Sequence, residues 1–152
     1  SERHAQGLYP ELPERAFVQM GDFFGFALET AAGMGFAGVA LVVFFGKAVK
    51  MAQGLAHTHA GRADLALAQL AAWCREAGVA PGLAAEVAAA NTARQAFERL
   101  HPAAPAALEA VGLRILAAAR ELSGAPLAIE ALILDYEGGV AWRGRGNGSA
   151  DE

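Results

Sequence analysis

The sequence predicts an α/β fold: a small, mostly parallel sheet with helices on both faces, a long helical stretch between the second and third strands, and a C-terminal β-hairpin. Three observations favour it. Residues 39–45 are apolar at every position, which is typical of an interior strand of a parallel sheet. Strand-like and helix-like stretches alternate around that run, as in β-α-β-α units. A turn-forming stretch, 135–139, separates two short strand-like runs near the C-terminus.

The first third of the chain provides the first half of this pattern. Residues 1–15 are expected to be an extended lead-in, and residues 16–20 a short strand. Gly21 and Asp22 then form a turn and an N-cap, because an aspartate side chain accepts hydrogen bonds from the free amides of a first helical turn. The spacing of apolar residues predicts a helix over 23–33.

After the apolar strand, Gly46 and Lys47 are expected to form a turn before a helix over 48–55. Three further helices are predicted from capping and proline signals. They run from Asp64 to Gly78, from Pro81 to Leu100, and from Pro105 to Leu122.

A strand over 127–134 and a hairpin partner over 140–143 complete the fold. Residues 1–143 are therefore expected to form a single domain, and the polar, glycine-rich residues 144–152 a disordered tail.

Composition excludes several classes of function. A length of 152 residues suits one domain with a real core, and a net charge of −4 argues against a general nucleic-acid binder. The single cysteine, Cys74, cannot form an internal disulfide, which fits a cytoplasmic protein. The chain opens at Ser1 without a secretory signal and is expected to be a truncated or processed piece.

The uncharged stretch 30–46 reaches the short limit for a membrane-spanning helix. Gly33, Gly35 and Gly38 interrupt its first half, and its second half is β-branched and aromatic. A turn followed by a buried strand explains this stretch better, so no membrane partner is expected.

Charge is unevenly distributed along the chain. Residues 30–63 contain no acidic residue, whereas both lysines of the chain, Lys47 and Lys50, fall there together with Arg62. Gly46 and Lys47 follow the buried strand directly, and ligands of open α/β sheets bind beyond the carboxyl ends of parallel strands. We therefore interpret this stretch as an anion site, with an ordinary solvated helix face as the alternative.

Two other places offer weaker candidates. The turn from Gly21 and Asp22 to Gly25 has room for a ligand near the backbone, although it also reads as a cap and a close packing point. His57 and His59 suit donors to an anionic ligand or an ordinary helix end. They lack the third and fourth ligands of a zinc site at any recognised spacing, so no metal is expected.

No nucleophile elbow, P-loop or CxxC motif is present, and no catalytic residue is identified.

The combination of motifs resembles the CbiD family, the cobalt-precorrin-5B methyltransferases that methylate ring carbon one of a corrin precursor. The motifs are Gly-Asp-x-x-Gly-x-x-Leu, Gly-Lys-x-x-Lys, Thr-His and Ala-Asn-Thr-Ala. In this sequence the first motif is formed by Gly21, Asp22, Gly25 and Leu28, and the second by Gly46, Lys47 and Lys50. The third is Thr58 and His59, and the fourth is residues 90–93. Further matches are Ser1 to Ala5, Gly54 and Asp64.

The resemblance implies S-adenosylmethionine as methyl donor, a cobalt-bearing, many-carboxylate tetrapyrrole as acceptor, and a cytoplasmic step of the anaerobic route to vitamin B12. It implies that this chain is the C-terminal part of a longer protein, lacks the N-terminal half, and is inactive alone. The alternative is a non-catalytic binding or oligomerisation domain for an anionic nucleotide or tetrapyrrole. The apolar pairs Phe23/Phe24 and Phe44/Phe45 would favour a homo-oligomer if they face a partner rather than a core.

Overall fold

The computed structural model describes residues 2–20, 23–54, 63–124 and 127–146. The helices and strands follow one another along the chain as α1 (Glu2–Leu8), the 3-10 helix η1 (Glu14–Ala16), α2 (Phe24–Gly33), β1 (Gly38–Phe44), α3 (Phe45–Ala52), α4 (Ala63–Glu76), α5 (Pro81–Ala88), α6 (Ala93–Leu100), α7 (Pro105–Ser123), β2 (Ala128–Leu134) and β3 (Val140–Gly146).

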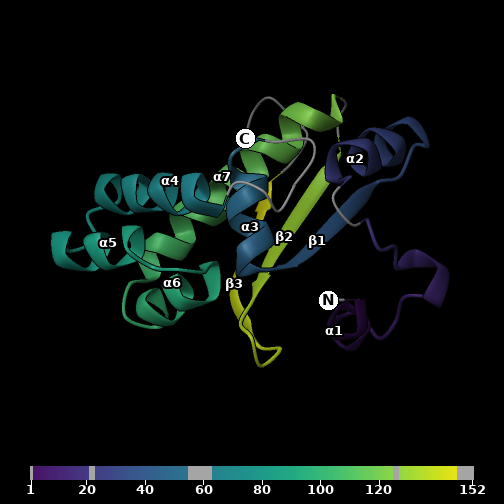
Figure 1. The fold of residues 1–152 in the computed structure, drawn as a ribbon. Helices are drawn as coiled ribbons and strands as arrows, with labels where there is room; N and C mark the ends of the chain where they lie inside the picture. The colour runs from purple at the N-terminus through teal and green to yellow at the C-terminus, as the bar shows by residue number, and fades with distance from the viewer. Residues whose placement is uncertain (1, 21–22, 55–62, 125–126, 147–152) are drawn as a thin grey trace.

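The strands form one mixed sheet in the order β1-β2-β3 (Figure 1). β1 pairs parallel with β2, from Gly38 opposite Ala128 to Phe44 opposite Leu134. β3 returns antiparallel to β2, and the register shifts between Ile133 and Leu134. In the described part of the chain, β1 and β3 are therefore the two edges of the sheet.

The two faces of the sheet have different partners. Ile129, Ala131 and Ile133 of β2 belong to the main apolar core, which also includes buried residues of α2, α3 and α7. Because side chains alternate along a strand, Glu130 lies on the opposite face, where it is bonded to Tyr9 just after α1. Helices α4, α5 and α6 gather beside α7, far from α1 (Figure 1).

This architecture confirms the α/β class, the long helical stretch between consecutive parallel strands, and the C-terminal hairpin. The parallel pair is β1 and β2, and the helical stretch between them comprises α3 to α7. The uncharged stretch 30–46 is the end of α2, a connection and β1, as expected of a turn and a strand. Among the described helices, none combines the length and apolar character needed to cross a membrane.

Several local predictions are wrong. Residues 17–20 join no strand, so β1, predicted to be interior, lies at an edge. The lead-in contains α1, because Ala5 buries its side chain. The helix expected over 81–100 is two helices, because Thr92 caps a new one. Finally, β3 continues to Gly146, three residues into the expected tail.

Candidate functional site

The carboxyl end of β1 passes into α3 without a connecting loop. Phe44 is extended, with ψ at 162°, and Phe45 already begins the helix. The predicted turn at Gly46 and Lys47 is thus the first turn of α3. Backbone N–H groups of that turn have no partners within the helix, so they and the positive end of the helix dipole lie at this edge of the sheet.

Tyr136 reaches the same edge from β2. It lies in the turn to β3, which Asp135 holds by accepting hydrogen bonds from the backbone N–H groups of Glu137 and Gly139, both at 2.8 Å. The Tyr136 ring stacks on Phe44 with 5.8 Å between centroids. Its hydroxyl accepts from the Gly46 backbone N–H. The turn after β2 therefore closes over the first turn of α3.

A second helix begins at this place. Thr92 caps α6 by accepting from the Gln95 N–H at 3.0 Å, and the Gln95 side chain accepts from the Asn91 N–H at 2.8 Å. A Cβ added to Gly46 would lie 3.5 Å from the Cβ of Ala93, so the starts of α3 and α6 are in contact. Two stretches far apart in the sequence, 46–50 and 90–93, meet here.

Arg94, on the first turn of α6, completes the arrangement. Its guanidinium carbon lies 4.9 Å from the centroid of the Tyr136 ring, within the range of a cation–π contact. It also bonds Glu98 at 3.4 Å, but both side chains are largely exposed, so this ion pair is weak. We call Gly46, Lys47, Arg94 and Tyr136 the carboxyl-end site.

The electrostatics of the carboxyl-end site suit an anion. Burial raises the pKa of Tyr136, and the Gly46 N–H and Arg94 only partly offset that rise, so the hydroxyl is neutral at physiological pH. Lys47 is half-buried in the first turn of α3. The Arg94 guanidinium and two helix N-termini thus lie at one edge of the sheet, and Lys47 is on the first turn of one of these helices, an arrangement that fits a carboxylate or phosphate.

α1 also reaches this edge. The His4 ring meets Phe44 edge-on with 5.6 Å between centroids, and His4 Nδ1 is buried with no hydrogen-bond partner in the described part of the chain. Gly138 has a φ of +92°, and a Cβ there would lie 2.6 Å from His4 Cδ2. The close approach of His4 to the turn after β2 therefore requires glycine at position 138.

Comparison with known proteins assigns the chain to a family. The family described as CbiD, C-terminal domain, matches residues 57–145, more than half of the chain. The chain belongs to the CbiD family. No solved structure matches it. The CbiD match includes residues 90–94 and Tyr136, so half of the carboxyl-end site lies within the family domain.

Several curated relatives carry the name Cobalt-precorrin-5B C(1)-methyltransferase. The protein of Nitratidesulfovibrio vulgaris is 53% identical over 118 residues, covering 76% of this CbiD chain and 30% of the relative. The protein of Salinispora arenicola is 40% identical over 150 residues, covering 95% and 39%. That of Thermus thermophilus is 44% identical over 98 residues, covering 64% and 27%. The chain spans about a third of the length of these relatives.

The structure separates the candidates singled out in the sequence. Lys50 lies on α3 about 4.5 Å farther along the helix axis than Lys47, and both are half-buried. Gly25 is buried in the first turn of α2, which Figure 1 places beside the amino ends of β1 and β2, away from Gly46. Gly25 therefore does not join the carboxyl-end site, because α2 lies at the opposite end of the sheet.

The other candidates cannot be placed with them. Gly21, Asp22, Thr58 and His59 lie outside the described residues, as do His57 and Arg62. Asp64 lies in the backbone of α4, but its side chain is not among those described. In the described part of the chain, no group of three or more potential metal ligands is present.

Sequence reasoning missed Arg94 and Tyr136. Tyr136 had a usable signal, because it follows a strand predicted to run parallel to β1 and so had to lie at the same edge. Arg94 directly follows the Ala-Asn-Thr-Ala stretch that carried the resemblance. Because one helix was predicted to continue through that stretch, the helix N-terminus that positions Arg94 was not expected.

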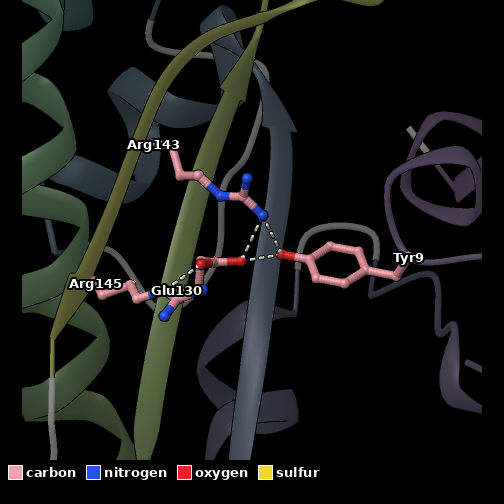
Figure 2. Close-up of polar contacts among 4 residues, drawn as sticks. All are labelled: Tyr9, Glu130, Arg143 and Arg145. Atoms are coloured by element: carbon pink, nitrogen blue, oxygen red, sulfur yellow. Dashed lines mark hydrogen bonds and ion pairs between the residues drawn. The ribbon is translucent and has the colours of Figure 1, made fainter. Parts of the chain in front are cut away.

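A second polar cluster lies on the face of the sheet opposite the main core (Figure 2). Glu130 of β2 accepts from Tyr9, from Arg143 at 3.2 Å and from Arg145 at 2.5 Å. Burial raises the pKa of Glu130, but these hydrogen bonds outweigh it and lower the pKa to about 2. We call these four residues the Glu130 cluster; it ties the segment after α1 to β2 and β3.

A shallow hollow of about 450 Å³ lies between the start of α7 and β3. Its walls include Trp142, whose indole N–H donates to Glu109 at 2.5 Å. Pro102 and Pro105 line it as well. Among the described residues that line the hollow there is no lysine or arginine, so it offers less to a polycarboxylate than the carboxyl-end site does.

Proposed function

We propose that this chain is the C-terminal domain of an S-adenosylmethionine-dependent methyltransferase that methylates C-1 of cobalt-precorrin-5B in anaerobic vitamin B12 biosynthesis. The observation that carries the reaction is the name shared by relatives that are 40% and 53% identical to the chain. A cytoplasmic location follows from such a biosynthetic role. Because the relatives are about three times as long as the matched part, the chain acts together with the region that precedes it and is inactive alone.

The role we propose for this domain is to hold carboxylates of the tetrapyrrole. Arg94 and Lys47 supply charge, and the neutral Tyr136 hydroxyl can donate a hydrogen bond. Charge-assisted hydrogen bonds to carboxylates are among the strongest in proteins. Methyl transfer from a sulfonium needs mainly alignment of the methyl group with the attacking carbon, so a rigid grip on the substrate is a direct contribution to rate.

Further contacts are proposed for the residues that the motifs identify. Lys50, next along α3, extends the cationic face toward another carboxylate. Thr58, His59 and Asp64 follow the same helix in sequence, and Gly21, Asp22 and Gly25 precede α2 or begin it. We assign no described residue to the methyl donor.

Domain replacement tests the proposal. The joined protein is defined as the N. vulgaris relative in which this chain replaces the matched C-terminal part. Transfer of labelled methyl from S-adenosylmethionine to cobalt-precorrin-5B is expected in the joined protein and absent in the 152-residue chain alone. A joined protein that unfolds cooperatively at the temperature of the parent but transfers no methyl group would contradict the proposed function.

A further inference from the structure

β1 has the composition of an interior strand but lies at an edge. Its sequence, GVALVVF, contains no charged residue and no proline. On its other side it has no strand partner in the described part of the chain. Uncharged strand edges without a strand partner pair readily with other strands, and proteins normally protect them with charges, bulges or covering segments.

Large apolar side chains are exposed on α2 and on the connection that leads into β1. Phe26 on α2 and Met34 just after it are each 69% exposed, and Phe36 is 56% exposed. Met34 and Phe36 lie in the short connection from α2 to β1, and the carbonyl of Ala37 pairs with β2 at 3.1 Å. We call these three residues and the free edge of β1 the α2–β1 surface.

The backbone of α2 lies beside the start of the sheet. Figure 1 shows α2 beside the amino end of β1, on the side of the molecule away from α4, α5 and α6. Gly38 and Ala40 at that end of the strand are exposed. Three large exposed apolar side chains within eleven residues, on segments that lead into a strand without a described partner on one side, favour an interaction site.

The relatives identify the partner. The chain covers only 30% to 39% of two of them, and the matching family is the C-terminal domain, so the remaining length largely precedes it. We propose that the α2–β1 surface binds the preceding region of the longer CbiD proteins, with a strand of that region added to β1 and its apolar side chains covering Phe26, Met34 and Phe36. The inference rests on the proposed role as a C-terminal domain, but not on methyl transfer.

Hydrogen exchange followed by mass spectrometry tests this without any activity measurement. Peptides covering residues 24–44 are compared between the 152-residue chain and the joined protein, with residues 140–146 of β3 as the reference edge. We expect exchange over 24–44 to slow by about tenfold or more in the joined protein and to stay unchanged over 140–146. Unchanged exchange over 24–44 would overturn the proposal.

Matched variants locate the surface. Phe26→Glu with Met34→Glu is expected to leave the melting temperature of the 152-residue chain unchanged and to lower that of the joined protein by several degrees. Phe26→Ala is the milder version. Leu113→Glu is the control, because Leu113 is 53% exposed on α7 and should matter in neither protein. Equal effects of the double variant in both proteins would overturn the proposal.

Sedimentation of the 152-residue chain tests whether a second copy of the chain occupies the α2–β1 surface instead. A homodimer that protects 24–44, with no added protection in the joined protein, would assign the surface to a second copy and overturn the proposal. The preceding region added as a separate polypeptide gives an independent reading. We expect it to slow exchange over 24–44 at a 1:1 ratio and to fail with Phe26→Glu/Met34→Glu, and no protection over 24–44 in this mixture would count against the proposal.

Discussion

The two edges of the sheet show opposite solutions to the same problem. β3 carries Arg143 and Arg145, both bonded to Glu130, and its register with β2 is irregular. Such charges and irregularities prevent a strand edge from pairing with another chain. β1 carries none of them. The difference is what the proposed addition of a strand to β1 requires, because β3 carries protecting charges and an irregular register and β1 does not.

The edges also differ in how they are held. β1 is held by its parallel pairing and by the residues it buries under α3. β3 is additionally fixed to α7, because Trp142 packs against Gly112 and bonds Glu109. The contact of β3 with α7 and the Glu130 cluster can each be tested by substitution.

The largest effect is expected where β3 meets α7. A Cβ at Gly112 would lie 2.4 Å from ring atoms of Trp142, and the same ring lies so close to Gly144 that a Cβ there would be 2.3 Å from it. Gly112→Val should destabilise the chain by about 3 kcal/mol in urea unfolding. Gly82→Ala, at an open position of α5, is the control and should be neutral or slightly stabilising.

Glu130→Gln should have the next largest effect. It keeps the shape of the side chain but removes the charge that Tyr9, Arg143 and Arg145 share. We expect a loss of about 2 kcal/mol by chemical denaturation. Glu121→Gln, an exposed glutamate of α7, should leave stability unchanged. Equal stabilities of the Glu130 and Glu121 variants would show that the Glu130 cluster does not contribute to the free energy of unfolding.

The pH dependence of stability should report the same cluster. The pKa of Glu130 falls from an ordinary 4.5 to about 2 in the folded protein. Its contribution is therefore complete above pH 4.5 and is lost as the pH falls from there toward about 2. Unfolding measured across that window should show a steeper loss of stability in the wild type than in Glu130→Gln, and parallel curves would contradict this.

Arg145→Gln should have the smallest effect. Its side chain is 79% exposed, so the ion pair with Glu130 is screened by water even at 2.5 Å. A loss below about 1 kcal/mol is expected from thermal unfolding. The same change should increase self-association of the chain, because it removes one of the charges that protect the β3 edge. Light scattering measures this self-association. A loss of stability comparable to that of Glu130→Gln would contradict the expected order of effects.

Local patterns predicted the elements that depend on local signals. The apolar run 39–45 gave β1, Pro105 gave the start of α7, and the turn 135–139 gave the hairpin. The failures concern pairing and breaks. Whether 39–45 is interior or at an edge depends on which other strands exist, and an apolar run cannot show that. The break before α6 depends on a single cap, Thr92, in an otherwise helical stretch.

Half of the residues of the carboxyl-end site were singled out from the sequence. Gly46 and Lys47 were found because a charge asymmetry and a strand end coincide in one stretch of sequence. Arg94 and Tyr136 come from elements far away in the chain and join only when α6 and the turn after β2 pack on the start of α3. Whether all of these residues contact a ligand stays a prediction.

Calorimetric titration of the joined protein with cobalt-precorrin-5B tests the central claim most directly. If the carboxyl-end site holds carboxylates of the corrin precursor, Arg94→Met should weaken binding by about tenfold, and Lys47→Met with Arg94→Met by more. Arg99→Met, an exposed arginine farther along α6, should bind like the wild type. Unchanged affinity in the Lys47 and Arg94 double variant would contradict the account.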